Sequence, residues 1–272
     1  MAISQQNMLF YSQNNAALST KRAGPSHGPT ICFIPGWGGD HWIWQQNFEA
    51  CAMQNDTIIV DFPGFGRSQL TKSQLEIEAS AQLIVEMLNA SGVKDCVLVG
   101  HSLGGALALA VASILNKRAL AVVAVDSLVF NVIYPKTTEP MIEEIMSPFK
   151  TDFKQAIDDL TATYFSENTA LEDKERVLKD MHQSNPEHGI FVLENYLAWD
   201  REAYMERYHG PIHAIVANVH QPIIDSQLLE RVIVKVINET GHYIMLDQCE
   251  ALQSYLTDII APQQTNNYAI KD

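Results

Sequence analysis

The chain has 272 residues, of which 47% are hydrophobic, and this is enough to form a sizeable core. Lys and Arg number 18 against 32 Asp and Glu, so the net charge is −14. Such an acidic surface repels nucleic-acid phosphates and anionic lipid headgroups, so the composition argues against nucleic acid and membrane surfaces as partners.

The start of the chain, MAISQQNMLFYSQNN, has no basic segment followed by an apolar run, so we expect no signal peptide. No run of about 18 apolar residues predicts a membrane span. The four cysteines are scattered and show no C-x-x-C spacing. We therefore expect a cytoplasmic protein without membrane insertion. The sequence does not reveal its oligomeric state.

Continuous apolar runs predict strands that are buried on both faces of a parallel sheet. These runs are Thr30–Ile34, Asp56–Val60, Asp95–Val99 and Leu120–Val125, and two weaker strands precede them near Met8–Ser12 and Ala16–Lys21. Between the runs, apolar residues recur at helical spacing, as at Ile77, Ala81, Ile84 and Leu88. Strands that alternate with helices predict a mostly parallel, doubly wound α/β sheet.

The alternation stops at about residue 129, and only helical patterns follow until residue 210. We expect helices to begin near Thr151, near Thr169 and at Pro186. Strands return at Pro211–Ala217 and Val232–Ile237, before a last helix over about 248–260. We therefore predict a core domain of residues 1–128 and 211–272. A helical cap of residues 129–210 is inserted between strands six and seven, over the sheet edge where ligands bind in such folds.

The segment Gly100-His101-Ser102-Leu103-Gly104 matches G-x-S-x-G and lies between a predicted strand and a predicted helix. This is the setting of a nucleophile elbow, in which the residues two before and two after the serine nearly touch and must be small. The helix dipole would favour an oxyanion that develops beside the serine. We predict that Ser102 is the nucleophile and that His101 is structural. The alternative is a glycine-rich turn in which Ser102 only caps the helix.

With three further motifs, this segment resembles the α/β-hydrolase superfamily, in the lineage of small cap-bearing esterases, over nearly the whole chain. The motifs are Phe33-Ile34-Pro35-Gly36-Trp37-Gly38-Gly39, Asp61-Phe62-Pro63-Gly64-Phe65-Gly66-Arg67-Ser68 and Gly241-His242. The resemblance implies that His242 is the general base, because this fold has the chain order Ser, acid, His. It also implies an oxyanion hole formed by the backbone N–H groups of Trp37 and Leu103. The family usually has His-Gly where this chain has Pro35-Gly36, but neither donor is lost.

The acid of the implied triad is open between two aspartates. Family members usually carry it just after strand seven, where this chain has Gln221. Asp126 closes the sixth predicted strand at the same sheet edge as Ser102, and some members place the acid there. Asp225 lies a few residues beyond the usual place but is also a plausible helix N-cap. We favour Asp126, keep Asp225 as the alternative acid, and leave a Ser–His dyad as a third possibility.

These residues predict a serine hydrolase that cleaves carboxylic esters of small to medium, neutral or apolar small molecules through an acyl-enzyme. Residues 136–207 hold 16 Asp or Glu and 8 Lys or Arg, a balance that does not attract anionic substrates. Trp37 is the tryptophan best placed to line an acyl pocket. The sequence carries no cofactor or metal motif, so we expect neither group. Alternatives are C–C bond, thioester or amide hydrolysis or a lyase reaction at the same site, or a ligand-binding protein with little turnover.

Overall fold

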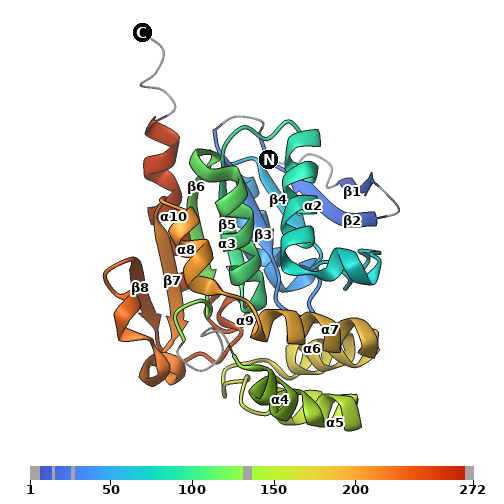
Figure 1. Ribbon diagram of the computed structural model, residues 1–272. Coiled ribbons are helices and arrows are strands. Elements are labelled where there is room, and N and C mark those ends of the chain that lie inside the picture. Colours follow the sequence, from blue (N-terminus) through green and yellow to red (C-terminus); the bar gives the residue numbers. More distant parts are fainter. Residues whose placement is uncertain (1–6, 14–15, 26–27, 131–136, 267–272) are drawn as a thin grey trace.

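Figure 1 shows a computed structural model of the protein, which describes residues 7–13, 16–25, 28–130 and 137–266. Eight strands form one sheet in the order β1-β2-β4-β3-β5-β6-β7-β8. The strands are β1 (Asn7–Gln13), β2 (Ala16–Ala23), β3 (Thr30–Ile34), β4 (Thr57–Val60), β5 (Cys96–His101), β6 (Ala119–Val125), β7 (Ile212–Ala217) and β8 (Val232–Ile237). The β1–β2 and β2–β4 pairs are antiparallel, and the pairs from β4 to β8 are parallel. The predicted mostly parallel α/β sheet is thereby confirmed.

The centre of the sheet is buried on both faces because its strands are apolar at successive positions. Every residue of β3, β4 and β5 is buried, whereas β8, at the edge, is buried only at its two end residues and is half-buried or exposed between them. β5 lies between β3 and β6, with Gly100 opposite Ile34 on one side and Ala124 on the other. The strand that leads to Ser102 is therefore held by parallel neighbours along its length.

Helices cover both faces of the sheet. The core helices are α1 (Gln45–Ala52), α2 (Ile77–Ala90), α3 (Leu103–Leu115), α8 (Arg201–Arg207), α9 (Ile244–Asp247) and α10 (Cys249–Asn266). Right-handed crossovers place α1 on the opposite face from α2 and α3, because the chain moves in opposite directions across the sheet before and after β4. The contacts agree with this arrangement, since α3 touches α2 and α8, while α1 touches α10.

Four further helices gather at the end of the sheet toward which β5 and β6 run (Figure 1). They are α4 (Glu139–Thr151), α5 (Phe153–Thr161), α6 (Leu171–Gln183) and α7 (Pro186–Leu197). α4 contacts α5 and α7, and α5 contacts α6. As the sequence predicts, Pro186 begins α7, and the Asn185 side chain caps it by accepting from the His188 N–H.

The division into a core and a cap of residues 129–210 stays a prediction. α4 to α7 fit that description, while α8 falls within the same range but contacts α3 of the core layer. Residues 131–136, which belong to the range predicted as the cap, lie outside the described residues. Within the part of the chain that the structure describes, no helix has the length and apolar character needed to cross a bilayer.

Candidate active site

Ser102 occupies a sharp turn between β5 and α3. Its backbone has φ 52° and ψ −126°, a conformation that is strained for a residue with a side chain. The crossing is so tight that a Cβ atom on Gly100 would lie 2.1 Å from the Gly104 carbonyl oxygen. A Cβ on Gly104 would lie 2.2 Å from the carbonyl oxygen of Pro35. Both glycines of the predicted elbow are therefore required by the space around them.

The end of β6 holds this turn in place. The Ser102 N–H donates to the Val125 carbonyl at 3.0 Å, and the Ser127 hydroxyl donates to the Ser102 carbonyl at 2.5 Å. Ser127 also lies so close to α3 that a Cβ on Gly105 would meet its hydroxyl at 2.3 Å. The backbone N–H and the carbonyl of the strained serine are thus both held by hydrogen bonds.

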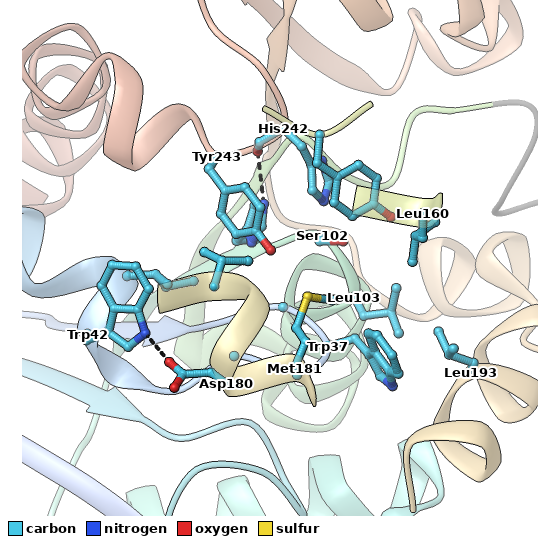
Figure 2. A pocket seen from close by; sticks show the side chains of 17 residues that line it. Trp37, Trp42, Ser102, Leu103, Leu160, Asp180, Met181, Leu193, His242 and Tyr243 are labelled. Carbon is cyan, nitrogen blue, oxygen red and sulfur yellow. Dashed lines mark hydrogen bonds between the residues drawn. The ribbon is translucent and has the colours of Figure 1, made fainter. Parts of the chain in front are cut away.

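Two cavities meet at Ser102, and both are lined by Ser102, Leu103 and His242. The smaller has a volume of about 40 Å³ and reaches toward the loop after β3 (Figure 2). The larger has a volume of about 170 Å³ and extends under α4, α5 and α7. Its further lining is mainly apolar and comprises Phe130, Ile145, Met146, Phe149, Leu160, Tyr164, Leu193, Leu197 and Ile223, together with Asp126 and His220. The predicted nucleophile and base therefore face one shared, largely apolar space.

His242 is fixed by contacts on its backbone and its ring. Its N–H donates to the Tyr164 carbonyl at 2.7 Å, and its own carbonyl lies 3.0 Å from His101 Nε2. The His101 and Tyr164 rings lie 4.5 Å and 4.3 Å from the His242 ring, centroid to centroid. His101 is buried, and burial lowers the pKa of its imidazole well below the ordinary value, so it serves as a neutral support. This agrees with the structural role predicted for it.

Asp126, the favoured acid, lies against His242. Its Oδ2 is 2.6 Å from His242 Nδ1, and its Oδ1 accepts from the Ala217 N–H at 3.0 Å. Burial by itself would raise the pKa of this carboxyl, but hydrogen bonds from His220 and His242 outweigh burial and lower the pKa to about 2. The carboxylate is therefore ionised at neutral pH. In the neutral tautomer of His242 that donates from Nδ1 to this carboxylate, Nε2 is the nitrogen that can accept a proton.

Asp225, the alternative acid, has other partners. Its Oδ2 lies 3.0 Å from Arg201 Nη2, and its Oδ1 accepts from the Gln227 N–H at 3.1 Å. The second contact caps η5 (Ser226–Leu228), as expected of a helix N-cap. Arg201 is buried and also donates to two backbone carbonyls. Asp225, in the middle of the β7–β8 connection, therefore neutralises a buried guanidinium.

The loop after β3 lies directly against the elbow. A Cβ on Gly36 would come within 3.0 Å of the Ser102 Cβ, so the peptide that joins Gly36 to Trp37 is beside the serine. Leu103 is the first residue of α3, where the helix itself offers no acceptor to a backbone N–H. Both predicted oxyanion donors thus belong to segments next to Ser102.

Three tryptophans lie in the loop after β3 and the segment that follows it, and their surroundings differ. They are Trp37, Trp42 and Trp44. Trp37 and Trp42 both line the smaller cavity. The Trp37 indole also donates to the Gly189 carbonyl at 3.0 Å. The Trp42 indole donates to Asp180 at 2.7 Å, and Figure 2 shows this bond as a dashed line. Trp44 is fully buried and packs on Phe33, with ring centroids 5.0 Å apart. Two tryptophans therefore tie the core loop to α6 and α7, and the third belongs to the core.

His220 is the residue that sequence reasoning missed. It lies in η4 (Asn218–Ile223), directly after β7, and its Nδ1 is 2.7 Å from the same Asp126 oxygen that His242 contacts. One feature of the sequence could have drawn attention to it, because it lies in the loop after strand seven, where the family usually carries its acid. Taken among nine scattered histidines, that place was not informative by itself.

Among the residues that the structure describes, two clusters bring three potential metal-ligating atoms within 4.8 Å of one another, namely Asp126 with His220 and His242, and Asp40 with His41 and Asp61. In the first cluster the nitrogen–oxygen distances of 2.6 and 2.7 Å are hydrogen-bond lengths. Two ligands on a tetrahedral zinc ion, each at about 2.0–2.1 Å, would lie roughly 3.3 Å apart. In the second cluster Asp61 accepts from the backbone N–H groups of His41 and Arg67. Hydrogen bonding accounts for both clusters.

Comparison with known proteins identifies the family. A sequence profile described as alpha/beta hydrolase fold matches residues 29–185, which are more than half of the chain. The chain belongs to the alpha/beta hydrolase family. This confirms the resemblance carried by the G-x-S-x-G segment and its companion motifs.

This alpha/beta hydrolase is similar to a pimeloyl-(acyl-carrier protein) methyl ester esterase of Aeromonas hydrophila, with 25% identity over 225 residues that cover 78% of this chain and 87% of that protein. A solved bromoperoxidase from Bacillus anthracis matches 94% of this chain and 100% of its own, at 16% identity and a TM-score of 0.81. A thermophilic esterase from Thermogutta terrifontis matches 96% and 100%, at 18% identity and a TM-score of 0.78. The two structures share the fold of this chain.

Proposed function

We propose that this hydrolase is a serine esterase that cleaves carboxylic esters through an acyl-enzyme. In this proposal Ser102 is the nucleophile, His242 the general base and Asp126 the acid. The observation that carries the proposal is the 2.6 Å contact between His242 Nδ1 and Asp126 Oδ2, at a cavity that His242 shares with Ser102. A buried, ionised carboxylate in that position holds the imidazole in the tautomer that can accept a proton at Nε2.

The reaction then proceeds in two halves. His242 Nε2 takes the proton of the Ser102 hydroxyl as its oxygen attacks the ester carbonyl, and the resulting tetrahedral adduct carries a negative oxygen. Collapse of the adduct breaks the ester bond, and His242 delivers its proton to the departing alcohol. Water repeats the sequence on the acyl-enzyme, releasing the carboxylic acid and the free serine. The Asp126 carboxylate stabilises the imidazolium in each half without taking its proton.

The backbone N–H groups of Trp37 and Leu103 are proposed to receive the oxyanion. Support comes from the closeness of Gly36 to the Ser102 Cβ and from the position of Leu103 at the start of α3. Backbone donors need no reorganisation during the reaction, and the loss of one such donor typically lowers the rate by about 10²–10³-fold. The dipole of α3 adds a further favourable field at the same point.

The larger cavity supports a neutral, apolar substrate of small to medium size. Its volume of about 170 Å³ and its lining of Phe, Leu, Ile and Met side chains favour a short hydrocarbon group over a charged one. Burying a carboxylate there would require a cationic partner, and no Lys or Arg is among the described residues that line it. The cytoplasmic location expected from the sequence stays a prediction.

Fluorophosphonate labelling, followed by a panel of p-nitrophenyl esters of increasing acyl length, tests this function. The wild type should be labelled and should hydrolyse short to medium esters, and Ser102→Ala should do neither. Ser113→Ala is the matched control, since Ser113 lies on the same helix and bonds only to the Ala110 carbonyl among the contacts described for its hydroxyl. A wild type that neither reacts nor turns over would favour the ligand-binding alternative. Faster cleavage of thioesters or amides than of esters would leave the catalytic site as proposed but would change the proposed bond from an ester to one of these.

A further inference from the structure

A second imidazole reaches the carboxylate of the proposed triad. His220 Nδ1 lies 2.7 Å from Asp126 Oδ2, and the His220 and His242 ring centroids are 6.0 Å apart. The Phe130 ring also packs edge-on against the His220 ring, with ring centroids 5.6 Å apart. Its side chain is 22% exposed, which allows proton exchange with solvent.

The two histidines are bonded to the same oxygen. Asp126 Oδ1 is occupied by the Ala217 N–H, so both imidazoles share Oδ2. Each N–H that an anionic oxygen accepts draws on the same negative charge, and a second donor therefore weakens the stabilisation of a proton on the first. When His220 is itself protonated, its positive charge also opposes a positive charge on His242. Both effects disfavour the imidazolium form of His242.

We propose that His220 is a positioning residue that divides the Asp126 carboxylate with His242 and thereby keeps His242 neutral, and able to act as a base, at mildly acidic pH. The inference rests on the proposed function for its consequence in catalysis. His220 does not contact the reacting atoms in this account and acts only through Asp126. The hydrogen bond to Asp126 raises the pKa of His220 above its ordinary value despite partial burial.

The other titratable groups around His220 are few. Among the residues that line the larger cavity with it, these are Asp126, Tyr164 and His242. β7 and β8 contact η4, and their titratable side chains are His213 and Lys235. His213 lies near the start of β7, and Lys235 lies over the Tyr255 ring at 5.9 Å. Asp225, farther along the same connection, is paired with Arg201. The carboxylate of Asp126 is therefore the charge that couples His220 to His242.

Two substitutions separate the hydrogen bond from the charge. His220→Phe keeps a ring beside Phe130 and removes the donor. His220→Asn keeps a neutral amide donor near the position of Nδ1 but cannot be protonated. The measurements are the acid limb of the kcat/KM–pH profile and an NMR titration of the His242 imidazole, made on the full chain of each variant after its fold is checked by circular dichroism.

In His220→Phe the acid limb and the His242 titration should both move to higher pH, by on the order of one pH unit, the size expected for one charge-assisted hydrogen bond. In His220→Asn they should lie between those of His220→Phe and the wild type. Unchanged titration of His242 in both variants, or a fall in kcat without any movement of the limb, would overturn the proposal and leave His220 a structural residue. The NMR titration needs no turnover, so an inactive wild type would refute the esterase function while still testing this coupling.

Discussion

The end of β6 and the connection after β7 both carry an aspartate at the carboxyl edge of the sheet, yet the two carboxylates have opposite surroundings. Asp126 is buried and contacts two imidazoles, whereas Asp225 contacts a buried guanidinium and caps a short 3-10 helix. The two residues are of the same type and carry the same kind of charge, so the partner determines what each can do. An imidazole that is held by a carboxylate can accept a proton from a hydroxyl. A guanidinium cannot, because arginine stays protonated in proteins.

The two segments also differ in how firmly the sheet holds them. The Asp126 N–H donates to the Ile215 carbonyl at 2.7 Å, and its Oδ1 accepts from Ala217, so β7 fixes both its backbone and its side chain. The backbone of Asp225 is held instead by the segment that follows β6, since its N–H donates to the Val129 carbonyl at 2.6 Å. A group that must hold an imidazole in register during catalysis is better placed on the strand than on the connection.

The largest effect should come from the residue that both cavities share. Ser102→Ala should lower esterase kcat by roughly 10⁴-fold or more, because no other hydroxyl is proposed to form the acyl-enzyme. The fold should persist, since the hydrogen bonds that hold the turn use the Ser102 backbone. Steady-state kinetics and thermal melting check this. Activity close to that of the wild type would remove Ser102 from the mechanism.

The esterase kcat of His242→Ala should be about as low as that of Ser102→Ala, since the two residues act as one unit and the losses of activity do not add. Kinetics of the two single variants and the double variant provide the check, with His213→Ala on β7 as the control histidine. If the double variant were much slower than either single variant, the two residues would be acting independently.

Asp126→Asn should lower kcat by a factor that approaches about 10⁴, because an amide in that place favours the wrong tautomer of His242. His220 would remain beside the amide but cannot replace the carboxylate. The kcat of purified Asp126→Asn on a short p-nitrophenyl ester is the measurement. A loss of less than about tenfold would favour a Ser–His dyad.

Asp126 should also make stability depend on pH. Its pKa of about 2 in the folded protein lies below the ordinary value of about 3.9, so it contributes stability above pH 4 that is lost as pH falls toward 2. The contribution is roughly 2–3 kcal/mol, at about 1.4 kcal/mol for each unit by which the pKa is lowered. Urea unfolding across this range should show the wild type losing about that much more free energy of unfolding than Asp126→Asn. Parallel pH dependences would show that the carboxyl is not stabilised by its partners.

The smallest effect on activity should come from the other aspartate. Asp225→Asn should change kcat by less than about threefold, because an Asn still caps a helix and Arg201 still contacts Glu202. The substitution should instead lower the melting temperature, since the buried Arg201 loses one of its two carboxylate partners. A large fall in kcat with an unchanged melting temperature would reverse the comparison.

Local features of the sequence were enough to predict the sheet and the elbow. The runs that form β3 to β8 are continuous or nearly so, and Gly100 and Gly104 are dictated by contacts within a few residues of Ser102 and with the strand beside it. The helix cap at Asp225 was also foreseen, because capping depends on the next two or three residues.

Contacts between distant segments could not be predicted in this way. The bond between Asp126 and His220 joins residues 94 positions apart, and the bond between the Trp37 indole and Gly189 spans 152. Of the aromatic residues between 129 and 210, Phe130, Phe149 and Tyr164 line the larger cavity, while Tyr196 and Trp199 pack against each other. Helical periodicity identifies an apolar face but not the element that covers it, so the choice among these rings required the fold.

The rate of Ser102 labelling by a fluorophosphonate in Asp126→Asn and in Asp225→Asn tests the central claim most directly, because it measures activation of the serine without a choice of substrate. The account predicts that labelling of Asp126→Asn is slower than that of the wild type by about 10²-fold or more, and that labelling of Asp225→Asn stays within about threefold. Slow labelling of Asp225→Asn together with normal labelling of Asp126→Asn would contradict it and assign the acid to the connection after β7.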